Sequence, residues 1–193
     1  MRARDNPFAA EHIHAIRFCP QGATLPGLMT RLKELNYRAA IVGPDGSGKT
    51  TFLEDLQRTL AEHDVPTRMV FVNDISPLPD PACRRLLAEL TRDVLLLLDG
   101  ADLVPRSCWS LLRRHTITHA RGLIVTSHRP GLLPTLIECT TSPALLLEIA
   151  RELQPPACPV PEESLDALFQ CHHGNLRACL RDLYDLYACI GPL

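Results

Sequence analysis

The stretch of sequence that decides the fold is Gly43-Pro44-Asp45-Gly46-Ser47-Gly48-Lys49-Thr50-Thr51. It matches the pattern G-x-x-x-x-G-K-[ST] of a phosphate-binding P-loop. The glycines let backbone N–H groups turn inward and form a nest for an anion. Lys49 can reach the β- and γ-phosphates of a nucleotide, and the Thr50 hydroxyl can ligate Mg²⁺. We therefore expect all nine residues to bind a nucleotide, with ATP and Mg²⁺ as the ligands.

The sequence on both sides of this loop supplies the context that the motif needs. Residues 38–42 form a short apolar run, which predicts a strand. Residues 51–63 carry apolar side chains at helical spacing, namely Phe52, Leu53, Leu56 and Leu60. A helix that begins here would point its positive dipole end at the bound phosphates.

Four more strands are predicted along the chain, at residues 68–73, 93–99, 122–127 and 135–140. They alternate with helical segments, which is typical of a parallel α/β sheet. The run Val94–Leu98 is apolar without alternation, which indicates burial on both faces of the sheet. The predicted fold is a five-stranded parallel P-loop sheet flanked by helices, with a short C-terminal helical lid.

Three segments follow from this pattern. Residues 1–37 form an N-terminal arm and helix, and residues 38–153 form the P-loop nucleotide-binding core. Residues 154–193 form a linker and the helical lid, because four prolines fall between residues 154 and 161 and two helical segments follow.

A second candidate site lies at Asp99, which ends the most apolar strand. The carboxyl ends of parallel strands meet at one edge of the sheet, so Asp99 is expected opposite the P-loop. There its carboxylate can hold a Mg²⁺-bound water.

The order of a P-loop strand, an extra strand, an Asp-ending strand and a strand ending in Thr126-Ser127 resembles the AAA+ class of P-loop ATPases. The resemblance covers roughly residues 38–190. It implies that the fourth strand lies between the two phosphate-site strands and ends in a polar "sensor 1" residue, here Thr126 or Ser127, with His128 adjacent. It also implies a "sensor 2" arginine after a glycine-containing turn, which matches Arg177 in Gly174-Asn175-Leu176-Arg177.

One departure from this pattern concerns hydrolysis. The family usually places a catalytic Glu directly after the metal-site Asp, and this chain has Gly100 there. Asp102 and the more remote Asp74 are the nearby acids that remain. Hydrolysis is thus expected to be slow, partner-dependent or absent. Arg113, Arg114 and Arg129 are candidates for an arginine finger by position alone.

Composition gives no indication of several other classes of function, and no basic patch is visible as a run in the sequence. Of 193 residues 46% are hydrophobic, and the net charge of −2 gives no electrostatic footprint for nucleic acid or an anionic membrane. The eight cysteines contain no C-x-x-C pair, and the pairs His115/His119 and His172/His173 lack further ligands at metal spacing. There is no apolar signal-peptide core and no apolar run of about 18 residues. We expect a cytoplasmic protein with reduced thiols.

Three functions fit these observations. The first is an AAA+-like ATP-binding switch or weak ATPase that acts with a protein partner or as a homo-oligomer. The second is a small-molecule kinase, because residues 45–51 are also similar to the loop of thymidylate kinases; the Asp-Arg motif and Arg-rich lid of those enzymes are missing here. The third is a non-hydrolysing interaction domain that nucleotide stabilises.

Overall fold

The computed structural model describes residues 5–18, 22–154 and 160–190. Most of the predicted linker, residues 155–159, lies outside this part. Contacts divide the chain into two compact units. The sheet unit comprises Cys19–Gly43 and Lys49–Cys139, and the helical unit comprises Met1–Phe18, Pro44–Gly48 and Thr140–Leu193.

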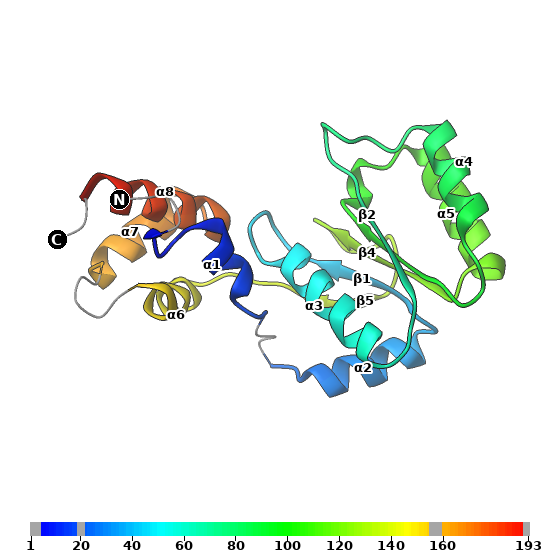
Figure 1. Ribbon diagram of the computed structural model, residues 1–193, viewed down its shortest axis with the longest axis horizontal. Coiled ribbons are helices and arrows are strands. Elements are labelled where there is room, and N and C mark those ends of the chain that lie inside the picture. Colours follow the sequence, from blue (N-terminus) through cyan, green and yellow to red (C-terminus); the bar gives the residue numbers. More distant parts are fainter. Residues whose placement is uncertain (1–4, 19–21, 155–159, 191–193) are drawn as a thin grey trace. The chain divides into compact units, whose positions relative to one another are not determined.

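The sheet unit contains the predicted parallel sheet of five strands. These are β1 (Arg38–Val42), β2 (Thr67–Phe71), β3 (Leu95–Asp99), β4 (Gly122–Ser127) and β5 (Thr135–Glu138). The strand order is β2-β3-β4-β1-β5, and all neighbours are parallel (Figure 1). The predicted place of β4, between the P-loop strand and the Asp-ending strand, is confirmed.

The register brings the ends of the three central strands to one edge. Val42, the last residue of β1, pairs with Ser127, and Leu98 of β3 pairs with Val125. The P-loop, Asp99 and the end of β4 therefore follow one another at the carboxyl edge of the sheet. This is where ligands bind in open parallel α/β sheets.

Four α-helices cover the two faces of this sheet, and a short 3-10 helix, η2 (Ala101–Leu103), follows β3. They are α2 (Leu25–Glu34), α3 (Lys49–Glu62), α4 (Asp80–Glu89) and α5 (Arg106–His119). Helices α2 and α3 lie on one face, and α4 and α5 on the other (Figure 1). Thr24 is the predicted N-cap of α2, since its side chain accepts a hydrogen bond from Gly27 N.

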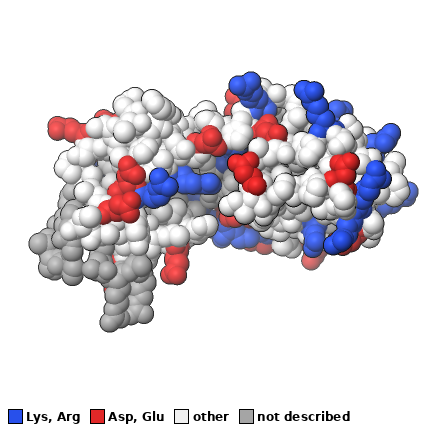
Figure 2. Space-filling model, turned by 90° about the horizontal axis from the view of Figure 1, so that it is seen from above, with Lys and Arg blue, Asp and Glu red and all other residues white. Residues whose placement is uncertain are grey.

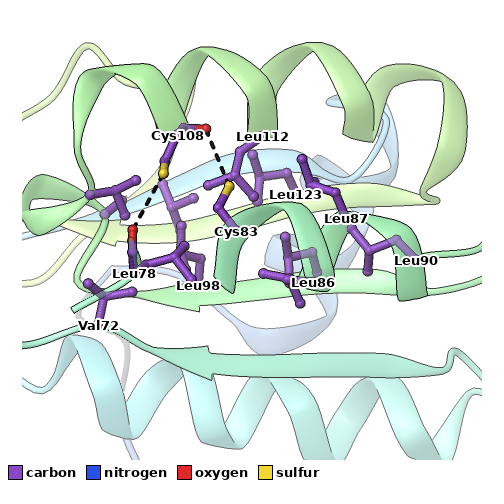
Figure 3. Packing of buried hydrophobic residues seen from close by; sticks show 14 of the residues in the cluster. Val72, Leu78, Cys83, Leu86, Leu87, Leu90, Leu98, Cys108, Leu112 and Leu123 are labelled. Carbon is purple, nitrogen blue, oxygen red and sulfur yellow. Dashed lines mark hydrogen bonds between the residues drawn. The ribbon is translucent and has the colours of Figure 1, made fainter. Parts of the chain in front are cut away.

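Strand β3 is buried on both faces, as its apolar run predicts. Leu95, Leu96, Leu97 and Leu98 are all 0% exposed. Leu96 and Leu98 belong to the core under α4 and α5, and alternation turns Leu95 and Leu97 to the other face. The thiols of Cys83 and Cys108 lie in the same core (Figure 3). All six cysteines in the described ranges are free, and two of them, Cys171 and Cys189, are exposed.

The helical unit contains α1 (Ala10–Ala15), α6 (Pro143–Leu153), α7 (Glu162–Cys171) and α8 (Leu176–Ile190). Its core includes Phe8, whose ring meets Tyr187 edge-on at a centroid distance of 5.2 Å. Asn6 Nδ2 donates to Tyr184 O at 2.8 Å. The N-terminal arm is thus built into the core of the C-terminal helices. Among the residues described, no helix has the length and apolarity that crossing a membrane requires.

Candidate functional site

The P-loop joins β1 to α3, which begins at Lys49. Gly46 and Gly48 adopt positive φ angles of 70° and 85°. The Lys49 ammonium donates a hydrogen bond to Gly43 O at 2.7 Å, and the buried Ser47 hydroxyl donates to Pro44 O at 2.8 Å. An ammonium carries three donors, so Lys49 has the capacity to bind phosphate oxygens as well as its own loop.

The Asp99 carboxylate is held by two hydroxyl groups. Thr50 Oγ1, in the first turn of α3, donates to Asp99 Oδ2 at 3.0 Å. Thr126 Oγ1, near the end of β4, donates to Asp99 Oδ1 at 2.6 Å and accepts from Gly100 N at 2.8 Å. A hydroxyl has one proton, so accepting from Gly100 N fixes the Thr126 proton toward Asp99. Residues far apart in the sequence thus meet at the carboxyl edge of the sheet.

Thr50 and Asp99 have the chemistry that Mg²⁺ requires. Hydroxyl and carboxylate oxygens are hard ligands, and Mg²⁺ sites use one or two carboxylates together with substrate phosphates. The two oxygen atoms lie 3.0 Å apart beside the start of α3. These residues therefore fit the metal that the P-loop implies.

Thr126 and Ser127, which the sequence leaves as alternatives for sensor 1, have different contacts. The Ser127 hydroxyl is buried and donates to Arg129 O at 2.8 Å. Successive side chains of a strand point to opposite faces, so only one of the two can face Asp99. In the structure that residue is Thr126. The register of β4 against β3 decides which of Thr126 and Ser127 faces Asp99.

The position after Asp99 has no space for a glutamate side chain. Gly100 lies in the left-handed region, with φ 84° and ψ 40°. A Cβ atom added there would clash with Val72 O and lie 3.2 Å from Val72 C. The backbone at this position is therefore itself unsuited to a glutamate.

Asp102, the other acid considered for this task, is bound to His128. Its Oδ2 accepts from His128 N at 2.5 Å and pairs with His128 Nδ1 at 3.0 Å. The pair joins η2 to the residue after β4. Asp102 Oδ2 is therefore already bound to the residue that follows β4.

Within the helical unit, two side chains lie against the glycines of the P-loop. A Cβ added at Gly46 would clash with Asn175 Oδ1 and lie 3.0 Å from Arg177 N. Asn175 Oδ1 also accepts from Ala178 N at 3.1 Å, so Asn175 is the N-cap of α8. A Cβ at Gly48 would lie 3.1 Å from the Phe18 ring. The sequence points to Arg177 but gives no signal for Asn175.

Two of the candidates for an arginine finger lie away from the Thr50–Asp99 pair. Arg113 and Arg114 belong to the C-terminal half of α5, at the opposite edge of the sheet. Arg129 and Asp74 are exposed. The rings of His115 and His119 stack at 4.3 Å, and no group of three His, Cys, Asp or Glu side chains suited to a metal ion occurs in the described part of the chain.

The strand order, the P-loop after β1 and Asp99 at the end of β3 define the AAA+ form of the P-loop fold. This chain has that fold, as the comparisons with solved structures show. A variant of RuvB from Thermotoga maritima superposes with a TM-score of 0.56 at 17% identity, over 81% of this chain and 58% of that chain. RuvB of the same organism, titled a Holliday junction branch migration motor, gives a TM-score of 0.54 at 15% identity, over 83% and 60%. NtrX from Brucella abortus in complex with ATP gives 0.50 at 18% identity, over 93% and 52%.

These likenesses establish the fold and do not extend to the whole of each relative. The chain spans 58% of the first RuvB chain and 52% of the NtrX chain. No family model matches the sequence, and no curated protein matches it either.

Proposed function

We propose that this protein is an ATP-dependent switch with slow or no hydrolysis, acting with a protein partner or as a homo-oligomer. The observation that carries the proposal is the Asp99 carboxylate, held between Thr50 of the P-loop helix and Thr126 of β4. Through Asp99, the first turn of the P-loop helix is connected to β4, the strand that lies between β1 and β3. RuvB, a branch migration motor, and NtrX, solved with ATP, share the fold and support this class.

In this proposal each residue of the site has a distinct task. The nest of P-loop N–H groups and the Lys49 ammonium bind the β- and γ-phosphates. Thr50 and Asp99 would hold Mg²⁺, which neutralises charge between the phosphates when it is bound. Thr126 orients the Asp99 carboxylate through its fixed proton. Binding of phosphates and Mg²⁺ would therefore act on the end of β3 through Asp99 and on the end of β4 through Thr126.

The water-activating position favours a switch over a rapid ATPase. Gly100 offers no carboxylate, and the Asp102 carboxylate is bound to His128. A general base must reach the attacking water within hydrogen-bond distance, directly or through one water. No observation favours the kinase alternative.

The contact of Asn175 with Gly46 supports the switching role. Because Asn175 caps α8, the first turn of that helix and the P-loop backbone share one contact. A change of the loop when phosphate binds would then bias the position of α8. Arg177, in the same turn, is the residue we assign to sensing the γ-phosphate.

Replacing Asp99 by Asn tests the metal assignment. Asn keeps the size and can still accept from Thr126, but it loses the negative charge. We expect Asp99→Asn to remove the gain in ATP affinity that Mg²⁺ gives the wild type, roughly tenfold or about 1.4 kcal/mol. Calorimetric titration of ATP with Mg²⁺ and with EDTA measures this gain. An equal gain in both proteins would make Asp99 a structural residue and contradict the proposal.

Replacing Arg177 by Ala tests the sensor assignment. We expect Arg177→Ala to weaken ATP by roughly tenfold, since a hydrogen bond to a charged group contributes about 1.5–3 kcal/mol, and to leave ADP nearly unchanged. Arg181→Ala is the matched control, because Arg181 is an exposed arginine one turn further along α8. Titration of both nucleotides separates the outcomes. Equal losses for ATP and ADP would rule out contact with the γ-phosphate.

A further inference from the structure

Five arginines of the sheet unit gather at the edge where its strands begin. We call them the N-edge arginines; they are Arg31, Arg38, Arg92, Arg113 and Arg121. Helices α2 and α5 end at this edge, and β1, β3 and β4 start there. At the right-hand end of Figure 2, Lys and Arg side chains gather with a few Asp and Glu side chains among them. This edge is opposite the Thr50–Asp99 pair, so the proposed nucleotide site does not use it.

The N-edge arginines include a row that follows the order of the strands. Arg92 precedes β3, Arg121 precedes β4, and Arg38 begins β1. Arg31 Nη2 donates to Thr135 O, at the first residue of β5. In the sheet these strands lie in the order β3-β4-β1-β5. Because neighbouring strands are about 4.8 Å apart, the row presents repeated positive charges along one line.

Neutral groups hold the guanidinium groups of Arg31, Arg38, Arg92 and Arg121 in place. The contacts are Arg31 Nη2 to Thr135 O at 2.9 Å, Arg38 Nη2 to Arg113 O and Thr116 Oγ1 at 3.2 Å each, Arg92 Nε to Thr118 O at 3.2 Å, and Arg121 over the Tyr37 ring at 5.0 Å. Carbonyl oxygens and an aromatic ring orient a guanidinium without neutralising its charge.

Within the described residues, the N-edge arginines form no ion pair with a carboxylate. The acids near the same edge are Glu34, Glu62, Asp64, Glu89 and Asp93. Glu89 pairs with Arg68 at 3.5 Å, and none of the five pairs with an N-edge arginine in the part of the chain that the structure describes. Burial, and then the charge of Arg113, lowers the pKa of Arg38 below its ordinary value. That effect fits the contact of the Arg38 guanidinium with Arg113 O.

We propose that the N-edge arginines bind the phosphodiester backbone of a nucleic acid without reading its sequence. Guanidinium forks match phosphate oxygens, and a regular row of cations matches a linear polyanion better than it matches the scattered charges of a folded acidic surface. The net charge of −2 for the whole chain conceals this edge, since acidic side chains predominate in α7 and the rest of the helical unit.

The test is fluorescence anisotropy of labelled single-stranded and duplex DNA of about 20 nucleotides, titrated with the full chain at several salt concentrations. Arg113→Gln with Arg121→Gln removes two charges whose side chains donate to no carbonyl among the described residues. Arg84→Gln with Arg85→Gln is the matched control, an adjacent exposed pair on α4. Thermal unfolding of each variant verifies that it is folded.

The wild type is expected to bind DNA with an affinity that falls linearly in log units with log salt. The Arg113/Arg121 pair should lower that slope by about two, or about one per arginine, and the α4 pair should leave it unchanged. Arg113→Lys with Arg121→Lys should keep the slope, because it keeps the charges. Absence of DNA binding at low salt, or equal slope changes for both Gln pairs, would overturn the proposal. Salt-sensitive self-association that the Arg113/Arg121 pair abolishes, without DNA binding, would overturn it in favour of a second copy of the chain.

Discussion

Lys49→Ala is expected to abolish measurable ATP binding, with the affinity falling roughly a hundredfold or more. Hydrogen bonds to charged groups contribute about 1.5–3 kcal/mol each, and the lysine of a P-loop reaches two phosphates. In the structure the Lys49 ammonium donates to Gly43 O, within the loop that would receive those phosphates. Alanine keeps the helix, because it is the best helix former, and removes the charge. Calorimetric titration of Mg-ATP measures the loss.

The chain offers an unusually clean control for this variant. Lys33 is its only other lysine, and it is exposed near the end of α2. Lys33→Ala should leave ATP affinity unchanged, and bound ATP should protect Lys49 but not Lys33 from acylation. Unchanged affinity in Lys49→Ala, with the variant folded by circular dichroism, would mean that the P-loop is not a nucleotide site.

The parallel sheet and its carboxyl edge are predictable from the sequence because they follow from local signals, whereas the place of β4 in the strand order is implied by the resemblance to AAA+ ATPases. The P-loop demands a strand before it and a helix after it, and an unbroken apolar run demands burial on both faces. Together with the alternation of strands and helices, these signals determine which residues reach the same edge. The structure confirms the parallel sheet. It also confirms the place of β4 between β1 and β3, which the resemblance to AAA+ ATPases implies.

The details of the candidate site depend on tertiary packing that no local pattern encodes. The sequence leaves Thr126 and Ser127 as alternatives, since the choice depends on the register of β4 against β3. It identifies a Gly-containing turn before Arg177, but Asn175 becomes notable only through its contact with Gly46. The N-edge arginines were concealed for the same reason, because they come from separate elements and form no run in the sequence.

Strand boundaries show a related limit. The third strand was predicted from Asp93, and it begins at Leu95. Val94 N bonds to Thr91 O in a turn, so the apolar side chain of Val94 extends the run without extending the strand. Hydrophobic runs report burial, and the hydrogen bonds that define a strand end where the neighbouring backbone turns away.

Gly100→Glu, which restores the acid that the family usually carries, is expected to destabilise the protein and to give no gain in hydrolysis. A non-glycine residue in the left-handed region costs about 1–2 kcal/mol, and the added Cβ must also move away from Val72 O. A cost of about 2 kcal/mol lowers Tm by roughly 4–8 °C in a domain of this size. Thermal unfolding by circular dichroism measures the first effect, and phosphate release at saturating Mg-ATP measures the second.

Two alanine variants separate the causes of that destabilisation. Gly100→Ala shares the backbone strain and the contact with Val72 but adds no carboxylate. Gly22→Ala is the matched control, because Gly22 has a similar φ of 73° and nothing within 4 Å of an added Cβ. The difference in Tm between them isolates the close approach to Val72 O, and we expect Gly100→Ala to be the less stable. The opposite outcome would be a Gly100→Glu variant that is as stable as the wild type and hydrolyses ATP faster. The backbone at this position would then admit a catalytic acid. The wild type would be an ATPase that lacks only this residue, which would contradict the proposal of a slow switch.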